Sequence, residues 1–227
     1  MKRVSCLILD LGGVLTEDQD QARVDEMMTL LGLSAASEAA RESFVASYWK
    51  RRTDYDRGLY GAAEYWGRIA SDLGLDPARR LSRRLDLDDR LGRLVDADLR
   101  SWFTMRPAMT DFLRGAKGRV RTLVMLSNIN EDGARYVREG GGRAWSGLFD
   151  ELVLSCEHRL LKPEPEIYAL ALGRAGARAD EALFVDDNPD NVRGALNAGL
   201  SSFRFEGAED FRLKLARDYE LAPGLRD

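Results

Sequence analysis

"CLILDLGGVLTED", residues 6–18, decides how the rest of the chain is interpreted. In this stretch a short apolar run ends at a single acid, Asp10, and two glycines follow where a second acid could have stood. An apolar run of this length, bounded by turn residues, indicates a strand buried within a parallel sheet. The stretch poses two questions: what a carboxylate does at the end of a buried strand, and why glycines come next.

The rest of the chain repeats this pattern of short apolar runs. Five runs are predicted as strands: 4–10, 122–128, 151–155, 182–187 and 201–205. Helical patterns precede or separate the last four: 106–117, 130–139, 165–175 and 189–198. Pro189 suits the first turn of a helix, and Gly199 suits the position just past its end. This alternation predicts an α/β protein with a doubly wound, parallel, Rossmann-like sheet and right-handed crossovers.

The gap between Asp10 and the next predicted strand is far longer than the dozen or so residues that an ordinary crossover needs. Its apolar residues recur at helical spacing in four segments: 20–32, 36–52, 60–73 and 86–101. We therefore predict an inserted helical subdomain over residues 17–105. The α/β core would then consist of residues 1–16 and 106–227.

Composition excludes several classes of function. The chain has 227 residues with 34 Lys and Arg against 38 Asp and Glu, so its net charge of −4 favours neither nucleic acid nor an anionic membrane. Its apolar stretches are far shorter than the roughly 20 residues of a membrane span, and the first has no small-residue cleavage site. These features predict a cytoplasmic protein. Cys6, Cys156 and the single His158 match no zinc or disulfide pattern and no Ser-His-Asp arrangement. The sequence carries no signal for an oligomeric state.

Polar side chains gather where the predicted strands end. Four strands lead to such residues, in chain order: Asp10, Ser127 with Asn128, Lys162, and Asp186 with Asp187. In a doubly wound sheet these ends converge on one crevice, which is the usual ligand position. Each residue alone also fits a structural role, such as a helix cap, a turn or a solvated lysine. Together they predict one functional site.

The residue types at this site indicate phosphoryl chemistry. Asp10 and Asp187 offer hard oxygen ligands, too few for a calcium cage but suited to Mg²⁺, which keeps water ligands and takes a phosphate oxygen. Lys162 and Ser127 provide a cation and a hydroxyl for the remaining phosphoryl oxygens. Asp10 would attack phosphorus and form an aspartyl-phosphate. We therefore expect a small phosphorylated substrate and a Mg²⁺ cofactor.

Four short motifs, in this order and spacing, resemble those of the haloacid dehalogenase superfamily: "DLGGVL", "LSN", "LKPEPEIY" and "VDDNPDN". The resemblance covers nearly all of the predicted core. It implies these roles: Asp10 as nucleophile and metal ligand, Ser127 and Asn128 as substrate-binding residues, Lys162 as the charge-stabilising lysine, and Asp186 and Asp187 as metal-site acids. It further implies that Asp187 is a direct ligand, that Asp186 acts through a metal-bound water, and that Gly12 contributes its backbone carbonyl. The implied activity is hydrolysis of a phosphoric monoester.

The helical insertion resembles the C1-type cap of this superfamily. Its segment "YDRGLYGAAEYW", residues 55–66, is similar to caps of the subgroup that contains glucose-1-phosphate phosphatase-like proteins and the amino-terminal domain of soluble epoxide hydrolase. The cap carries an aromatic and basic cluster: Trp49, Lys50, Arg51, Arg52, Tyr55, Asp56, Arg57, Tyr60, Tyr65 and Trp66. This cluster could select the substrate, because arginine grips anions and aromatic rings pack on sugars. We favour the simpler interpretation that Trp49, Tyr65 and Trp66 form the cap core and that the arginines are solvated.

The sequence departs from the family pattern at Gly12. Phosphatases of this family normally carry a second Asp there, which protonates the leaving oxygen and later activates water. General acid–base catalysis of this kind is typically worth ~10²–10⁴ in rate. A simpler role for Gly12 and Gly13 is a tight backbone turn that glycine forms at little cost. Either way, the departure predicts a slow phosphatase more than a different fold.

Two alternative functions stay open. One is a 2-haloacid dehalogenase in which Asp10 attacks carbon, a reaction that needs no divalent metal and leaves the paired Asp186 and Asp187 without a task. The other is a non-catalytic regulatory module that binds phosphate and metal without turnover, which the glycine at position 12 favours. Activity in the presence of a chelator distinguishes the dehalogenase from the phosphatase.

Overall fold

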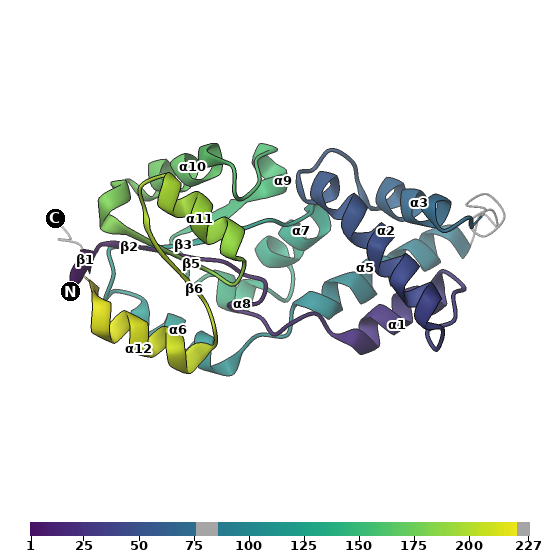
Figure 1. Ribbon diagram of the computed structural model, residues 1–227, viewed down its shortest axis with the longest axis horizontal. Coiled ribbons are helices and arrows are strands. Elements are labelled where there is room, and N and C mark those ends of the chain that lie inside the picture. The colour runs from purple at the N-terminus through teal and green to yellow at the C-terminus, as the bar shows by residue number, and fades with distance from the viewer. Residues whose placement is uncertain (76–85, 222–227) are drawn as a thin grey trace.

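A five-stranded parallel sheet forms the centre of the α/β core in a computed structural model that describes residues 1–75 and 86–221 (Figure 1). The strands lie in the order β4-β3-β2-β5-β6 and have these bounds: β2 Cys6–Leu9, β3 Thr122–Ser127, β4 Glu151–Leu154, β5 Ala182–Asp186 and β6 Ser201–Arg204. Every neighbouring pair is parallel. The five predicted strands are thus confirmed, and Asp10 directly follows the central one.

Helices cover both faces of this sheet. The predicted core helices are confirmed as α6 (Pro107–Ala116), α7 (Glu131–Glu139), α10 (Pro165–Ala175) and α11 (Pro189–Asn197). Successive side chains of a strand point to opposite faces. Leu7 and Leu9 therefore pack with α6 and α7, whereas Cys6 and Ile8 pack with α10 and α11. Figure 1 shows α10 and α11 along one face and α6 along the other, which is the doubly wound arrangement that the sequence predicts.

Several elements of the described chain were not predicted. They are β1 (Lys2–Val4), α8 (Arg143–Ser146), α9 (Ser155–His158), a 3-10 helix (Ala179–Glu181), α12 (Ala208–Asp218) and β7 (Tyr219–Leu221). The first and last described strands along the chain, β1 and β7, pair with each other in a separate two-stranded parallel sheet. α12 packs Phe211 and Leu215 beside α6, on the same face of the main sheet.

The insertion after β2 contains only helices among its described residues. They are α1 (Gln21–Leu30), α2 (Glu38–Asp56), α3 (Ala62–Asp72) and α5 (Asp86–Trp102). Residues 76–85 of the predicted cap and 222–227 of the predicted core lie outside the described residues. The helices enclose a core of their own, in which Tyr48, Tyr65 and Trp66 are buried together. Figure 1 shows these helices at the end of the molecule opposite the chain termini.

Two backbone segments connect the helical region to the core. They run side by side, because the Glu17 N–H bonds the Thr104 carbonyl at 2.7 Å and the Arg106 N–H bonds the Leu15 carbonyl at 2.8 Å. The end of α2 also contacts the core directly. There the Ser155 hydroxyl donates to the Asp56 carbonyl at 2.5 Å, and it accepts from the Ile129 N–H at 2.8 Å.

None of the described helices has the length and apolar character that a membrane span requires.

Candidate active site

The ammonium group of Lys162 lies between two carboxylates. Its Nζ is 2.6 Å from Asp10 Oδ1 and 2.7 Å from Asp186 Oδ2, and all three side chains are buried. Burial raises the pKa of Asp10, and the charge of Asp186 raises it further, while Lys162 opposes both effects. Burial pulls the pKa of Lys162 down, but the two carboxylates hold it above its ordinary value. Lys162 is therefore a charged lysine in a dry setting, where electrostatic interactions are strong.

Asp186 and Asp187 have different surroundings, although they are adjacent in the chain. Asp186 is fully buried and accepts hydrogen bonds from Lys162, from the Asn188 N–H at 2.8 Å and from the Asn191 amide at 3.1 Å. Asp187 is exposed and lines a cavity. The strand end thus fixes one acid within the core and turns the next one toward solvent.

The structure brings Ser127 and Asn128 to the same cavity, but the two side chains have different partners. The Asn128 amide donates to the Lys162 carbonyl at 3.0 Å and accepts from the Lys162 N–H at 2.8 Å. Its side chain thus holds the backbone of Lys162. The Ser127 hydroxyl makes one long contact of 3.4 Å, with the Asn128 carbonyl, and it can turn toward a ligand. The geometry assigns Asn128 a positioning role beside the substrate-binding role predicted for it.

Gly12 and Gly13 differ in what they require of the backbone. Gly13 has φ +69, and a Cβ built on it would lie 2.6 Å from Asp187 Oδ2. A side chain at position 13 would therefore push Asp187 out of place. Gly12 has no left-handed φ, and no atom lies within 4 Å of a Cβ built there. The tight turn predicted for both glycines thus explains Gly13 alone.

The cluster suits a divalent cation. Asp10, Asp186 and Asp187 each offer a carboxylate oxygen, and these oxygens lie within 4.8 Å of one another. Lys162 balances only one of the three negative charges. Oxygen ligands of this kind fit Mg²⁺, which accepts a small number of carboxylates and completes its octahedron with water and phosphate. The residues present therefore fit the predicted Mg²⁺.

A cavity of about 600 Å³ connects this cluster to the helical region. That volume lies within the usual ~300–1,000 Å³ range of small-molecule sites. From the core it is lined by Asp10, Gly12, Ser127, Lys162 and Asp187, and from α2 and α5 by Trp49, Arg52, Asp56, Asp98 and Trp102. Asp10, Asp187, Lys162 and Ser127 of the predicted site thus share one cavity with side chains of the cap, whereas Asp186 lies buried behind it.

Two interpretations of the cap cluster are wrong. Trp49 was expected in the cap core, but it is 50% exposed and packs edge-on against Trp102 at the cavity. Arg52 was expected to be solvated, but only 11% of its side chain is exposed. Tyr65 and Trp66 do lie in the cap core, as predicted. The pattern of aromatic residues along α2 does not reveal that Trp49 faces the cavity and not the core of the helical region.

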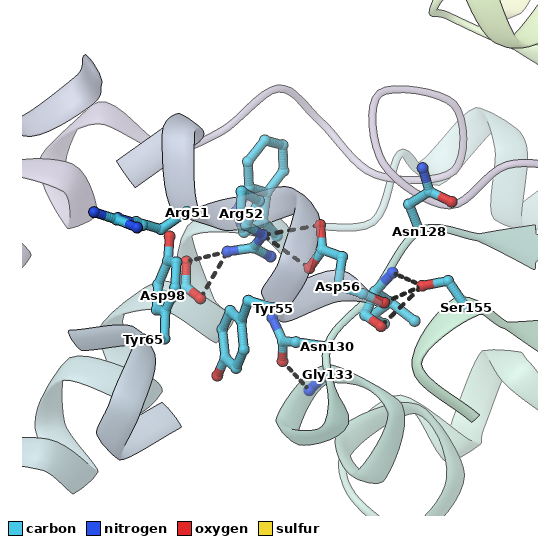
Figure 2. Close-up of polar contacts among 12 residues, drawn as sticks. Arg51, Arg52, Tyr55, Asp56, Tyr65, Asp98, Asn128, Asn130, Gly133 and Ser155 are labelled. Carbon is cyan, nitrogen blue, oxygen red and sulfur yellow. Dashed lines mark hydrogen bonds and ion pairs between the residues drawn. The ribbon is translucent and has the colours of Figure 1, made fainter. Parts of the chain in front are cut away.

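Arg52 is held between two carboxylates of the helical region (Figure 2). Its Nη1 donates to Asp98 Oδ2 at 3.0 Å and to the Tyr48 hydroxyl at 2.6 Å, and its Nε donates to Asp56 Oδ2 at 3.1 Å. Burial lowers the pKa of Arg52, but Asp56 and Asp98 outweigh that effect and raise it. Burial also raises the pKa of Asp56, while Arg52 lowers it.

A family model for the haloacid dehalogenase-like hydrolases matches residues 4–199. The chain belongs to this family of hydrolases. The match covers β2 to β5 of the sheet with their strand-end acids, and also the inserted helices. The predicted superfamily and the Rossmann-like fold with a helical cap region are thereby confirmed.

Relatives of this haloacid dehalogenase-like hydrolase include proteins named as dehalogenases and proteins named as phosphatases. One is (S)-2-haloacid dehalogenase 1 from Pseudomonas sp. (strain CBS-3), 26% identical over 79% of this chain and 76% of that protein. Another is D-ribitol-5-phosphate phosphatase from Bacteroides thetaiotaomicron, 24% identical over 92% of this chain and 95% of that protein. A third, phosphoserine phosphatase from Thermus thermophilus, is 34% identical over 55% of this chain and 47% of its own length.

Solved structures support the same fold. A family enzyme from Bacteroides thetaiotaomicron, in complex with magnesium and inorganic phosphate, superposes with a TM-score of 0.65 over 88% of this chain and 93% of that one, at 22% identity. A 2-haloacid dehalogenase from Pseudomonas syringae superposes with a TM-score of 0.64 over 94% and 99% of the two chains, at 19% identity. The two structures superpose about equally well, so this likeness shows the fold and does not distinguish between activities.

Sequence reasoning missed two residues of this hydrolase site. Asn191 follows Asp186 in the first turns of α11 and binds both of its carboxylate oxygens. The motif "VDDNPDN" contains Asn191, so its position relative to the helix start could have revealed it. Asp98 lies on α5 and meets Arg52 of α2, 46 residues earlier. No local pattern announces such a long-range ion pair.

Proposed function

We propose that this protein is a Mg²⁺-dependent phosphatase that hydrolyses a small phosphorylated metabolite, such as a sugar phosphate, with residues 17–105 acting as its cap. One observation carries the proposal: three carboxylates have oxygens within 4.8 Å of one another, and two of them pair with Lys162, which shares a cavity with the Ser127 hydroxyl. A dehalogenase that attacks carbon has no use for the surplus negative charge. A phosphatase does, because the carboxylates hold a metal ion. The positive charge of that ion then meets the negative charge of the phosphoryl group.

The residues of the chain would divide the chemistry as follows. One carboxylate oxygen of Asp10 attacks phosphorus, which forms an O–P bond and breaks the bond between phosphorus and the leaving oxygen. Lys162 and the Ser127 hydroxyl face the non-bridging oxygens, where charge spreads in the transition state. Water then attacks the phospho-enzyme at phosphorus and releases phosphate and free Asp10. Mg²⁺, held by Asp10, Asp187 and the Gly12 carbonyl and reached by Asp186 through water, would supply charge neutralisation and orientation.

Asn128 and Asn191 would keep the reacting groups in place. Asn128 fixes the backbone of Lys162, and Asn191 fixes the carboxylate of Asp186. Because well-oriented reacting groups account for a large part of catalysis, both residues support the site without touching phosphorus.

The glycine at position 12 makes this phosphatase unusual. Gly12 has no side chain that could protonate the leaving oxygen. Asp10 is the only acid within three residues of Gly12 in the sequence. We therefore expect slow turnover of substrates whose leaving oxygen needs a proton. This feature also favours the second candidate, a dehalogenase, because halide leaves without a proton and one relative with that activity matches most of the chain.

The test is a set of parallel assays. Hydrolysis of p-nitrophenyl phosphate should require Mg²⁺ and should stop with EDTA, and the Asp10→Asn variant should be inactive. Release of chloride from 2-chloropropionate in EDTA would instead favour the dehalogenase. Stoichiometric binding of phosphate and Mg²⁺ without turnover of either substrate would favour the regulatory module. We expect the protein to act in the cytoplasm, and detection in a membrane or secreted fraction would contradict this.

A further inference from the structure

The cap side of the cavity contains more acids than bases. Among the described residues that line the cavity, the cap and its first connecting segment contribute three acids, Asp18, Asp56 and Asp98, and one base, Arg52. The phosphoryl group belongs at the core end, with Lys162 and the metal site. The cap side therefore surrounds the part of the substrate that leaves with the oxygen.

Arg52 does not provide a positive charge for a substrate anion, because its charge is already balanced. Figure 2 shows its guanidinium between the carboxylates of Asp56 and Asp98, with hydrogen bonds to both. One arginine between two acids leaves a net negative charge in this cluster. Water screens this net negative charge only weakly, because the side chain of Asp98 is 5% exposed and that of Asp56 is 12% exposed.

One of the two carboxylate oxygens of Asp56, Oδ1, lacks an aligned hydrogen-bond donor among the described residues. This oxygen lies 2.9 Å from Arg52 Nε, but the N–H of that nitrogen is directed at Oδ2. Within the described part of the chain, Oδ1 is buried and accepts no hydrogen bond. A buried acceptor without a donor repels further acceptors, a carboxylate or a second phosphate among them.

A second cluster, at the cavity mouth, has the same composition. Arg106 lies 2.6 Å from Glu17 Oε2 and 3.4 Å from Asp18 Oδ1, so one arginine again serves two acids. Asp18 lines the cavity, and 93% of its side chain is exposed. Both clusters therefore add negative potential to the same side of the cavity, and low-dielectric walls focus such a field.

We propose that the cap side selects phosphomonoesters whose leaving group is uncharged or positively charged, and that it rejects those with a second anionic group. This inference rests on the proposed phosphatase function and deepens it. Acceptor-rich walls favour hydroxyl and ammonium groups, and Trp49 and Trp102 add apolar contact for the carbon atoms between them. A carboxylate on the leaving group would have to approach Asp56, Asp98 and Asp18 with no unpaired cation on that side to receive it, among the described lining residues.

Three small phosphomonoesters vary the charge of the leaving group at nearly constant size. 2-Aminoethyl, 2-hydroxyethyl and carboxymethyl phosphate have nearly the same size and differ by one charge at each step at neutral pH. We expect kcat/KM with Mg²⁺ to fall in this order, with at least about a tenfold difference between the first and last. Each compound is also tested as an inhibitor of p-nitrophenyl phosphate hydrolysis, so a slow substrate still reports its affinity. Equal values, or a preference for carboxymethyl phosphate, would overturn the proposal.

A variant and added salt identify the cause. Asp18→Asn should reduce the selectivity ratio by about two- to fivefold, the range measured for exposed charge pairs. Asp111→Asn, an exposed aspartate on α6 paired with Arg114, is the matched control and should leave the ratio unchanged. Raising the ionic strength from about 0.05 to 0.5 M should compress the ratio, because salt screens exposed charges. A salt-independent ratio, or equal ratios in both variants, would overturn the electrostatic explanation.

The two proposals fail in different ways. If p-nitrophenyl phosphate is hydrolysed and the three-compound series is flat or reversed, only the charge selection is wrong. If the wild type hydrolyses no phosphomonoester faster than the Asp10→Asn variant, the phosphatase function is wrong and the selection falls with it.

Discussion

The ammonium nitrogen of Lys162 lies 2.6 Å from Asp10 Oδ1, and it lies almost as close to Asp186. Asp10 directly follows β2, Asp186 ends β5, and Lys162 lies in the segment before α10; the pairing of β2 with β5 brings the two acids to the same edge of the sheet. In the proposed mechanism, this contact would allow a carboxylate to act as a nucleophile toward an anion. Without the lysine, two negative groups would meet in a dry cavity at high electrostatic cost.

Replacing this lysine should therefore reduce catalysis strongly. We expect Lys162→Met to lower kcat/KM by about 10²–10³-fold, comparable to the loss of one transition-state donor in other enzymes. The control is Lys50→Met, because the side chain of Lys50 is 64% exposed on α2 and pairs only loosely with Asp72. Steady-state kinetics of both variants, after circular dichroism confirms folding, decide the matter. A loss of less than about twofold at position 162 would indicate a structural lysine.

Replacing Asp10, the proposed nucleophile, should remove activity and increase the stability of the fold. Asp10→Asn should abolish turnover, because an amide of nearly the same shape is a poor nucleophile. In EDTA the same variant should melt at a higher temperature than the wild type, since it removes one of three crowded carboxylates served by one ammonium. Stabilisation of about 0.5–2 kcal/mol is typical when an active-site strain of this kind is relieved. Retained turnover would contradict the aspartyl-phosphate mechanism.

The two neighbouring acids at the end of β5, Asp186 and Asp187, should respond differently to substitution. Asp187→Asn should weaken Mg²⁺ activation more than about 100-fold, because Asp187 is exposed to the cavity and would bind the metal directly. Asp186→Asn should cost about 10- to 100-fold, the range for residues that orient ligands. It should also lower the melting temperature more, because Asp186 is buried and bonds Lys162 and Asn191. Titration of Mg²⁺ against activity, with thermal melts in EDTA, measures both effects. Identical metal dependence would refute the assignment.

The core of the fold could be predicted because its determinants are local. Each strand of the main sheet is a short apolar run. A helix such as α11 can also be located from its first residue, because Pro189 marks the first turn. The site acids could be predicted for the same reason, since they follow directly from the strand ends. β1 and β7 were missed because each has only three residues, and they pair with each other across nearly the whole chain.

The cap side of the site could not be predicted in the same way. Whether Arg52 is solvated or buried depends on Asp98, which is distant in sequence and follows no motif. Whether Trp49 packs inside the cap depends on how α2 is rotated relative to α5. The neighbours of Trp49 in the sequence, Tyr48 and Lys50, do not reveal this rotation, because each is compatible with either orientation of the helix. Substrate selection thus depends on the tertiary contacts that local patterns describe least.

The glycine next to the nucleophile gives the sharpest test of the mechanism. If no group replaces the missing acid, the rate of phospho-enzyme formation should depend strongly on the pKa of the leaving group, and p-nitrophenyl phosphate should be favoured over alkyl phosphates. Good leaving groups need no proton, so they hide the defect at that step. Rapid-quench measurements on a series of aryl and alkyl phosphates report this dependence. Among nearby acids, Asp18 lines the cavity and Glu17 pairs with Arg106, so Asp18 is the alternative proton donor to test by substitution.

Gly12→Asp should restore the missing function. The backbone at position 12 has no left-handed φ, and a Cβ there would meet no atom within 4 Å, so the new side chain can enter without displacing its neighbours. We expect turnover of alkyl phosphates to rise by part of the ~10²–10⁴ that general acid–base catalysis provides. Gly13→Asp is the matched control: φ +69 and the 2.6 Å approach to Asp187 predict lost metal activation there. A folded, metal-binding Gly12→Asp variant without any gain, beside a wild type that shows no leaving-group dependence, would mean that this enzyme obtains its proton elsewhere.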